Sequence, residues 1–436
     1  MDPVLIGTLL VSMMLILLLS GISIAIALAA TGLVGIITMR PWGAAEYLIA
    51  NFPYTFTAHF SFTVLPLFLF MGYMAFSANL SQRAFEAGQR WLGHVPGGLA
   101  MATVFGCAAF SAVCGSSVAT ASTMARVALP EMIRRGYKYS LAGGTIAAGG
   151  TLGVLIPPSG ILVIYSFITE ASLVKLFIAA IVPGIMTALI YMIGIYLLVK
   201  IRPELAGMDK QGAQAAPWTE RFAALGRSWE VMLLFAVVMG SIYLGIATAT
   251  EAAAVGAFLS FIMVAARKNA WQNIKNGLWE TGTATSAIFL LIIGAGLFSL
   301  ALNMSQLPTV IADQIVRMDL PVYVVFALII LIYIVLGALV DGISMILITM
   351  PIVFPIILQL GYDPIWFGII IVKAVELGCI TPPVGINVFV VKGSVPEAPL
   401  GEVFKGCIPF VLMELLIIVL LIAFPQIALF LVDYAA

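Results

Sequence analysis

Long apolar segments separated by short polar turns run along the whole chain. Backbone groups in lipid must satisfy one another, so segments of this length predict helices throughout. The mixed Trp, Tyr and charged character of residues 40–58 and 267–280 predicts helices in the membrane interface. The one sizeable polar stretch, 201–228, is interpreted as a linker. The apolar segments are 4–20, 22–39, 61–79, 97–113, 117–133, 140–166, 177–200, 229–248, 252–266, 282–302, 321–340, 343–360, 364–391 and 406–432.

Together with this pattern, the composition predicts the fold class. Of the 436 residues, 62% are hydrophobic and 9% are charged, against about 45–50% and about 25% in soluble domains. So few charges cannot cover the surface of a soluble protein this large, and we predict an all-α polytopic membrane protein. The net charge is zero and the charges are scattered, which argues against nucleic acid as a partner. With only His59 and His94 and no HExxH motif, an enzyme is not expected, and we expect no cofactor.

The two halves of the chain resemble each other. An offset of 225 residues relates several glycines and prolines in the same order, which predicts an internal repeat of residues 1–200 and 229–436. The paired positions are Pro157 and Pro158 with Pro382 and Pro383, Gly153 with Gly378, Pro130 with Pro355, and Gly136 with Gly361.

The basic residues predict the orientation. If 80–96 is cytoplasmic, alternation places fifteen basic residues inside and only Arg40, Lys175 and Arg317 outside, as the positive-inside rule expects. Both termini are then periplasmic, 201–228 is a cytoplasmic linker, and the repeats have inverted topology, which is typical of secondary transporters. The inner set is Arg83, Arg90, Arg134, Arg135, Lys138, Lys200, Arg202, Lys210, Arg221, Arg227, Arg267, Lys268, Lys275, Lys392 and Lys405.

The paired prolines predict interrupted helices at about 140–166 and 364–391. Proline lacks an N–H and crowds the carbonyl four residues earlier, so these pairs release backbone carbonyls at membrane depth. Such groups need protein, water or a cation as a partner. The restarting half-helices present N–H groups that favour an anionic solute, and Ser159 and Asn387 are candidate donors to that solute.

Each interrupted helix follows two apolar arms joined by a small polar turn, at about 97–135 and 321–360. A re-entrant hairpin and a pair of full spans both fit this pattern. Asp341 lies in the second turn, where a carboxylate is costly unless it binds a cation or is protonated; its counterpart in the first turn is Ser116.

Two basic residues lie within apolar segments, Arg126 and Lys373, and both are candidates to contact a carboxylate. Alternatively, Arg126 snorkels to the cytoplasm or pairs with Glu131, and Lys373 pairs with Glu376.

Three motifs taken together are specific: TEAAAVGA (250–257), GGTLGVLIPPS (149–159) and ELGCITPPVGIN (376–387). Through these motifs the chain resembles the large membrane subunit of tripartite ATP-independent periplasmic (TRAP) transporters. Ala249 and Arg126 depart from the residues that relatives commonly have. Further similar stretches are SFTVLPLFLFMGYMA (61–75), WLGHVPGGLA (91–100) and CGSSVATAS (114–122).

The resemblance implies an elevator-type importer of a carboxylate-bearing anion in the bacterial inner membrane, driven by sodium. It implies a small membrane subunit and a periplasmic substrate-binding protein as partners. A self-sufficient sodium-dicarboxylate symporter and, less favoured, a passive channel are the alternatives. It also implies two sodium sites, the first formed by Ser111, Gly115, Ser116, Thr151 and Gly153, and the second by Gly337, Asp341, Ser344, Gly378 and Thr381.

Overall fold

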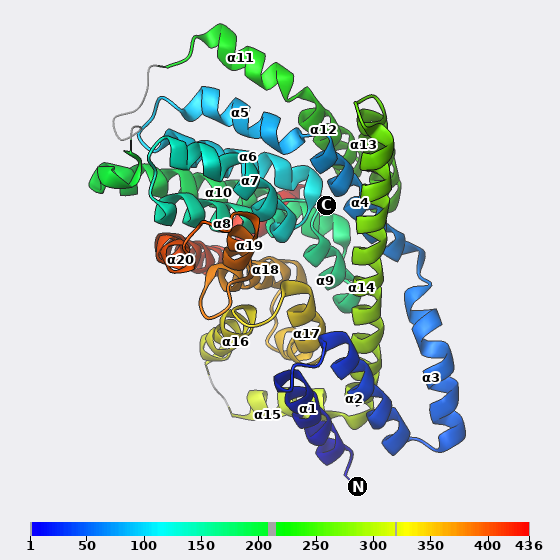
Figure 1. Ribbon diagram of the computed structural model, residues 1–436. Coiled ribbons are helices and arrows are strands. Elements are labelled where there is room, and N and C mark those ends of the chain that lie inside the picture. The colour runs from blue at the N-terminus through cyan, green and yellow to red at the C-terminus, as the bar shows by residue number, and fades with distance from the viewer. Residues whose placement is uncertain (1, 208–214, 319–320, 436) are drawn as a thin grey trace.

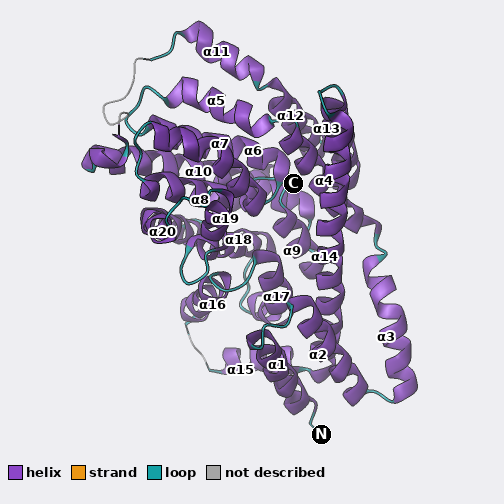
Figure 2. Ribbon diagram, viewed as in Figure 1, coloured by secondary structure: helices purple, strands orange, loops and turns teal. Residues whose placement is uncertain are grey.

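The computed structural model describes residues 2–207, 215–318 and 321–435, and every regular element in those ranges is a helix (Figure 2). Lys210, counted above among the inner basic residues, lies outside them. The helices of the first half are α1 (Pro3–Leu19), α2 (Ile24–Met39), α3 (Trp42–Thr57), η1 (Phe60–Thr63), α4 (Val64–Ser77), α5 (Leu80–Leu92), α6 (Gly98–Cys114), α7 (Ser117–Arg134), α8 (Tyr139–Leu155), α9 (Gly160–Thr169) and α10 (Leu173–Ile201).

The second half begins after a short polar region that contains η2 (Pro203–Leu205) and α11 (Trp218–Arg227). Its helices are α12 (Trp229–Tyr243), α13 (Ala249–Ala265), α14 (Ala270–Ser305), α15 (Leu307–Arg317), α16 (Val322–Gly337), α17 (Gly342–Gln359), α18 (Pro364–Ile380), α19 (Ile386–Ser394), α20 (Leu400–Ala423) and α21 (Gln426–Ala435).

The helix bounds repeat along the chain with the offset found in the sequence. Adding 225 to the bounds of α7 and α8 gives the bounds of α17 and α18, and α2 falls on α13 to within one residue. The largest departure is α14, a continuous helix of 36 residues that covers the counterparts of both α3 and α4. Residues 270–280, expected to lie as a separate interfacial helix, are therefore the first turns of this long helix.

Several helices are long and apolar enough to cross a membrane. By length and composition there are five among the described residues, or up to seven if each of two bent pairs forms one span. Five further apolar helices are shorter. One bent pair is α8 with α9, which meet at 40° around Pro157 and Pro158, so the predicted interruption of 140–166 is present. These features define a multi-pass membrane protein.

The α6–α7 and α16–α17 pairs each turn back on themselves. The Leu99 N–H at the start of α6 donates to the Tyr137 hydroxyl, just beyond α7, at 3.3 Å, so the outer ends of this pair lie together. In the second pair, Phe326 of α16 packs against Tyr362 and Trp366, which follow α17, with ring centroids 5.0 and 5.2 Å apart. Both tips point into the molecule and meet the interrupted helices there.

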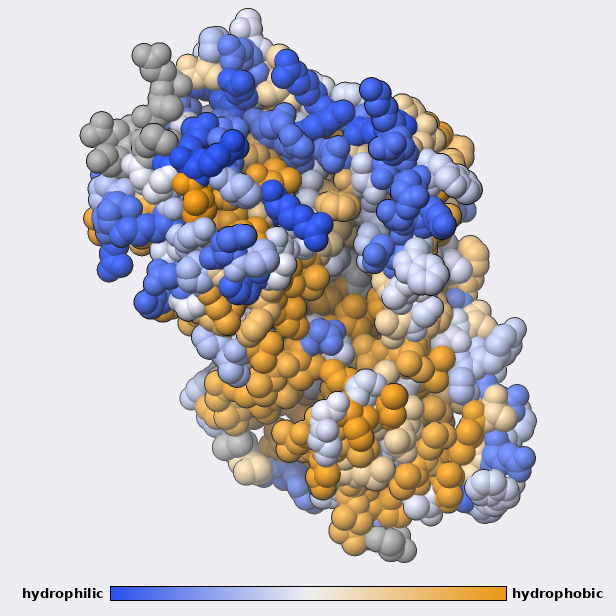
Figure 3. All heavy atoms as spheres, in the orientation of Figure 1, coloured by the Kyte–Doolittle hydropathy of each residue, from blue (hydrophilic) through white to orange (hydrophobic). Residues whose placement is uncertain are grey.

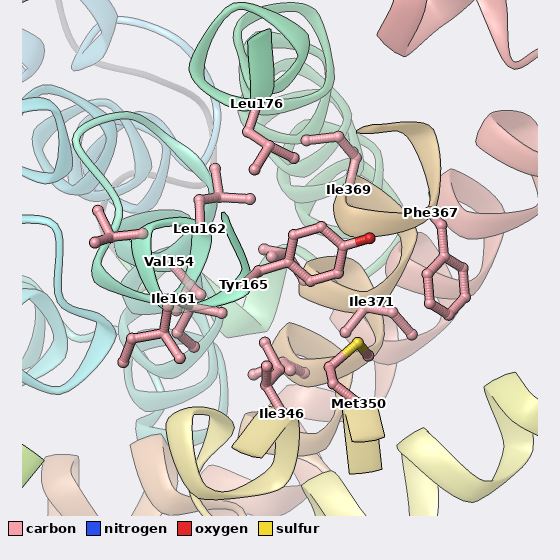
Figure 4. Close-up of a cluster of buried hydrophobic side chains, with 14 of the residues drawn as sticks. Val154, Ile161, Leu162, Tyr165, Leu176, Ile346, Met350, Phe367, Ile369 and Ile371 are labelled. Atoms are coloured by element: carbon pink, nitrogen blue, oxygen red, sulfur yellow. The ribbon is translucent and has the colours of Figure 1, made fainter. Parts of the chain in front are cut away.

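Segments from both halves share one hydrophobic core. Figure 4 shows Tyr165 of α9 pointing between side chains of α17 and α18, among them Ile346, Met350 and Phe367. Its hydroxyl donates to the Pro364 carbonyl oxygen at 2.7 Å. The polar tip of the buried tyrosine is thus satisfied, and the ring fixes α9 against the second interrupted helix.

Polar residues gather at one end of the molecule. Hydrophilic surface covers the end that carries α5 and α11, while hydrophobic surface dominates the middle and the opposite part (Figures 1 and 3). At that end α11 packs across α5, where Trp91 Nε1 donates to the Arg221 carbonyl oxygen at 3.0 Å and Arg90 pairs with Glu220. The polar stretch between the halves therefore contains an ordered amphipathic helix.

Candidate functional site

The tip of the first hairpin contacts the first helix interruption. Gly115 adopts φ +66°, a conformation that glycine reaches without strain, and its carbonyl oxygen accepts from the Gly160 N–H at 3.4 Å. A Cβ on Gly153 would lie 2.6 Å from the Ser116 carbonyl oxygen, too close for any side chain. The small residues are thus needed for the close approach of α7 to α8.

Buried oxygen atoms without hydrogen-bond partners lie around this contact. Ser111 Oγ is buried and unsatisfied, and so is Thr120 Oγ1, which faces only the weakly polar Cys114 thiol. Thr120 Oγ1 also lies 2.9 Å from the position of a Cβ on Gly153. An unsatisfied buried oxygen is costly until it gains a hydrogen-bond partner or a cation, and this set of neutral oxygens is of the kind that a hard cation binds. Sequence reasoning missed Thr120, although it lies in the polar first turn after Ser116.

Thr151, a residue of the first predicted sodium site, makes its hydrogen bond within its own helix. Its hydroxyl donates to the Ala148 carbonyl oxygen at 2.7 Å within α8 and lies within reach of the Tyr191 hydroxyl on α10. It is therefore directed toward α10 and away from the hairpin tip.

The second hairpin tip repeats this arrangement with a carboxylate. Asp341 caps α17: its Oδ1 accepts from the N–H groups of Ile343 and Ser344 at 3.1 Å each, and its Oδ2 accepts from the Ser344 hydroxyl. Its side chain nevertheless remains exposed to a cavity. Ser116 caps α7 in the same way, accepting from the Ala119 N–H at 3.3 Å. The pairing of Asp341 with Ser116 in the repeat thus places two N-caps at equivalent tips.

Glycine allows the second tip to reach its interrupted helix as well. A Cβ on Gly378 would lie 2.3 Å from the Gly337 carbonyl carbon, so the two backbones touch. Beyond the crossing, the Val384 N–H donates to the Ala338 carbonyl oxygen at 3.2 Å. Thr381 caps α18 and its hydroxyl donates to the Leu377 carbonyl oxygen at 2.6 Å, so it lies in the break itself.

Part of the carbonyl set released by the prolines is satisfied locally. The Ser159 hydroxyl, predicted as a donor to the solute, donates to the Val154 carbonyl oxygen and caps α9 by accepting from the Leu162 N–H at 3.3 Å. The Gly378 carbonyl oxygen accepts from the Thr381 N–H at 3.2 Å. Both Pro–Pro peptide bonds are cis. Each break therefore compensates some of its own lost helical hydrogen bonds.

A cavity of about 240 Å³ lies where the two tips and the two breaks meet. Its walls include Ser116 and Pro158 from the first half and Asp341 and Cys379 from the second. The remaining wall is formed by α4 and α14, which contribute mainly apolar side chains. The cavity thus combines polar hairpin tips with an apolar wall, as small-molecule sites commonly do.

Arg126 lines a larger neighbouring cavity of about 680 Å³ that shares Tyr73, Cys114 and Ser116 with the first. Its predicted pairing with Glu131 does not form, because Glu131 binds Arg134 and Arg135. Arg126 therefore contributes its charge to the cavity system.

Lys373 and Asn387 line neither cavity. Lys373 is fully buried and bonds to Glu376 at 2.5 Å, to Glu414 of α20 at 2.6 Å and to Thr187 of α10 at 3.1 Å. The ion pair of Lys373 with Glu376, given above as the alternative to solute binding, is thus observed. Asn387 Nδ2 donates to the Ala147 carbonyl oxygen at 3.0 Å and joins α19 to α8. Sequence reasoning missed Glu414, although it is a lone carboxylate in an apolar segment.

Comparison with known proteins gives the family. Residues 11–427 match the family described as "Tripartite ATP-independent periplasmic transporter, DctM component". The C4-dicarboxylate TRAP transporter large permease protein DctM of Pseudomonas aeruginosa is 34% identical over 373 residues, which cover 85% of this chain and 86% of that protein. The isethionate TRAP transporter permease protein DctMQ of Oleidesulfovibrio alaskensis is 30% identical over 94% of this chain and 64% of that longer protein.

Among solved structures, the YdaH transporter of Alcanivorax borkumensis is similar in fold. The TM-score is 0.62 at 15% sequence identity, with 98% of this chain and all of that chain covered. The chain therefore belongs to the TRAP transporter family, as its DctM large permease component. It is a multi-pass membrane transporter subunit and not an enzyme, as the sequence predicted.

Proposed function

We propose that this permease imports a carboxylate-bearing anion across the bacterial inner membrane, with sodium as the coupling ion. The observation that carries the proposal is the meeting of two hairpin tips and two interrupted helices around one cavity, with the Asp341 carboxylate at its edge. The half-helices α9 and α19 begin near this point, and their N-termini favour an anionic group. The relatives named for C4-dicarboxylate and isethionate are permeases for anions, which supports an anionic solute here.

Sodium is proposed to bind at the two tips. At the first, the unsatisfied Ser111 and Thr120 hydroxyls and the backbone near Gly115, Ser116 and Gly153 supply neutral oxygens. At the second, Asp341 and Ser344 supply oxygens beside the Gly337–Gly378 crossing. Each uncompensated positive charge carried inward gains about 2.3 kcal/mol per 100 mV of membrane potential. Two sodium ions per monoanion, or three per dianion, therefore drive accumulation.

The transport step is proposed to be an elevator movement between two inverted repeats. The repeated helix bounds and the equivalent hairpins support the repeat, and the charge bias of the sequence supports its inversion. In this proposal the hairpins and interrupted helices carry the solute past α4 and α14, which form the facing wall of the cavity. A small membrane subunit and a periplasmic binding protein complete the system, consistent with the tripartite family description.

The test is uptake of radiolabelled candidate carboxylates, beginning with succinate, into proteoliposomes that contain the permease and its small subunit. Each anion is supplied with the binding protein encoded beside the permease. We expect uptake only with that protein loaded with its own ligand and with an inward sodium gradient. A potassium gradient of equal size is the control.

Three outcomes contradict the proposal in different ways. Uptake of free solute without the binding protein indicates a self-sufficient symporter. Flux that persists when the sodium gradient is dissipated indicates a channel. Uptake driven equally by potassium or by a proton gradient removes sodium as the coupling ion.

A further inference from the structure

The larger cavity, called here the vestibule, is lined by α4, α7 and α14 and by residues at the polar end of the molecule. It has a volume of about 680 Å³ and is continuous with the tip cavity through shared residues, including Ser116 and Val118. Figure 3 shows the surface hollowed on this face between the regions of α7 and α14. The vestibule therefore links the hairpin tips with the hydrophilic end.

Two charged residues of opposite sign line the vestibule, Arg126 on α7 and Glu280 on α14. Within the part of the chain that the structure describes, neither takes part in a hydrogen bond or an ion pair, and both side chains are exposed. The other polar residues around them, such as Asn79, Ser122 and Asn276, are neutral. Arg126 and Glu280 are therefore the two charged residues among those that line the vestibule.

The two charges lie at different depths. Arg126 follows the tip residue Ser116 by ten positions on α7, which corresponds to about 15 Å along a helix at 1.5 Å per residue. Glu280 precedes Ala284, which lines the tip cavity, by four positions on α14, or about 6 Å. Along its helix the backbone of Arg126 therefore lies farther from the tip residues than that of Glu280 does.

We propose that the vestibule is a second, charge-separated site on the route between the tips and the polar end. Arg126 binds the anionic solute after it leaves the tips, and Glu280 attracts the cation released with it. The proposal rests on the proposed function for the identity of the two species, but the charge selectivity of the vestibule is independent of transport. Because each wall attracts one species, the released solute and the released ion are held at separate points of the vestibule.

The experiment measures this selectivity directly with charged thiol reagents. Ala119→Cys places a thiol between the tip and Arg126 on the vestibule wall, in a chain whose four buried cysteines are replaced by alanine. The probes are an anionic sulfonatoethyl and a cationic trimethylammonioethyl methanethiosulfonate. Each transfers its thioalkyl group to the thiolate, forming a disulfide, and methanesulfinate leaves.

We expect Arg126→Gln to lower the reaction rate of the anionic reagent roughly three- to tenfold, because a unit charge focused by low-dielectric walls changes the local ion concentration on this scale. The reaction rate of the cationic reagent should stay equal or rise. Glu280→Gln should lower the cationic rate by a similar factor. Arg126→Lys should keep the parent rates. Arg134→Gln is the matched control on the same helix, outside the vestibule and paired with Glu131.

Rates that are the same for Arg126→Gln and Arg134→Gln overturn the proposal. So does a thiol at position 119 that reacts with neither reagent in otherwise unchanged protein. If the reagent selectivity is found but sodium-driven uptake is not, the proposed function fails and the vestibule assignment stands. If sodium-driven uptake is found but the reagent selectivity is not, the vestibule proposal fails and the proposed function stands.

Discussion

At the scale of single residues, the two hairpin tips have the same architecture but different charge. Ser116 and Asp341 both cap the helix that follows them, so capping alone accounts for the hydrogen bonds of either side chain. What capping does not require is the negative charge of Asp341 at the edge of a cavity inside a membrane protein. Substitution can separate the helix cap that Asp341 provides from the negative charge that it carries.

Asp341→Asn should abolish the sodium dependence of uptake while keeping the cap, because an amide oxygen still accepts from the Ile343 and Ser344 N–H groups. Asp341→Ala should lose both, with an added cost of about 1 kcal/mol for the missing cap. The measurements are initial uptake rates across a series of sodium concentrations and the thermal unfolding midpoint in detergent. Unchanged sodium dependence in Asp341→Asn removes this carboxylate from the cation site.

Lys373 forms a buried polar cluster with Glu376, Glu414 and Thr187. Lys373→Met should destabilise the protein strongly, by about 3–5 kcal/mol, because it leaves the buried Glu376 and Glu414 carboxylates without a cation. The control is Lys405→Met, which breaks an exposed pair with Glu402 and should cost less than about 1 kcal/mol. Equal unfolding midpoints for the two variants in detergent contradict this prediction.

At the scale of elements, close contact between backbones sets how the hairpins meet the interrupted helices. Gly153 packs against Ser116, and its counterpart Gly378 packs against Gly337; neither contact has room for a side chain. The rigid backbone cannot yield as a flexible side chain does, so packing at these points is sensitive to a single methyl group.

Gly378→Ala should therefore push α16 away from α18 and displace the Asp341 tip. We expect a lower unfolding midpoint, with overpacking costing about 1–3 kcal/mol, and a higher sodium concentration for half-maximal uptake. Gly393→Ala is the control, since nothing lies within 4 Å of the added Cβ on α19. A Gly378→Ala protein with the sodium response and stability of that control argues against the crossing as a determinant of the site.

At the scale of the whole molecule, hydrophilic surface and basic residues share one end. α5 and α11 are joined there by Arg90 with Glu220, and Glu230 of α12 binds both Arg83 and Arg267. The opposite end carries Arg40, beside the start of α1. This clustering of basic residues is the pattern from which the positive-inside rule predicts that the α5 end is cytoplasmic.

A cysteine introduced at each end tests that orientation. In intact spheroplasts, a membrane-impermeant maleimide should label Arg40→Cys and should label Arg90→Cys only after the membrane is permeabilised. Both native side chains are exposed, and the four native cysteines are again replaced by alanine, because Cys114 and Cys379 line the cavities. The reverse pattern would place the α5 end outside and overturn the predicted sidedness.

The sequence by itself determined the features that follow from local chemistry and from the solvent. Lipid requires apolar helices, so the membrane class and most helix bounds could be predicted. Paired prolines interrupt a helix wherever they occur, and the 225-residue offset predicted where the second interruption lies. Asp341 was found because charged groups are rare in these segments, and Ser116 was found as its counterpart in the repeat.

The tertiary structure decided which side chains share a space, because that depends on contacts between segments distant in sequence. It brought Lys373 to Glu414, which also accepts a hydrogen bond from the Tyr191 hydroxyl, and kept Lys373 away from the cavities. Thr151 points toward α10, and the Ser159 hydroxyl donates to the Val154 carbonyl oxygen within the same helix break. The tertiary structure also placed Arg126 and Glu280, 154 positions apart in the chain, around one vestibule. Periodicity and spacing give the face of each helix, but only packing determines which faces meet.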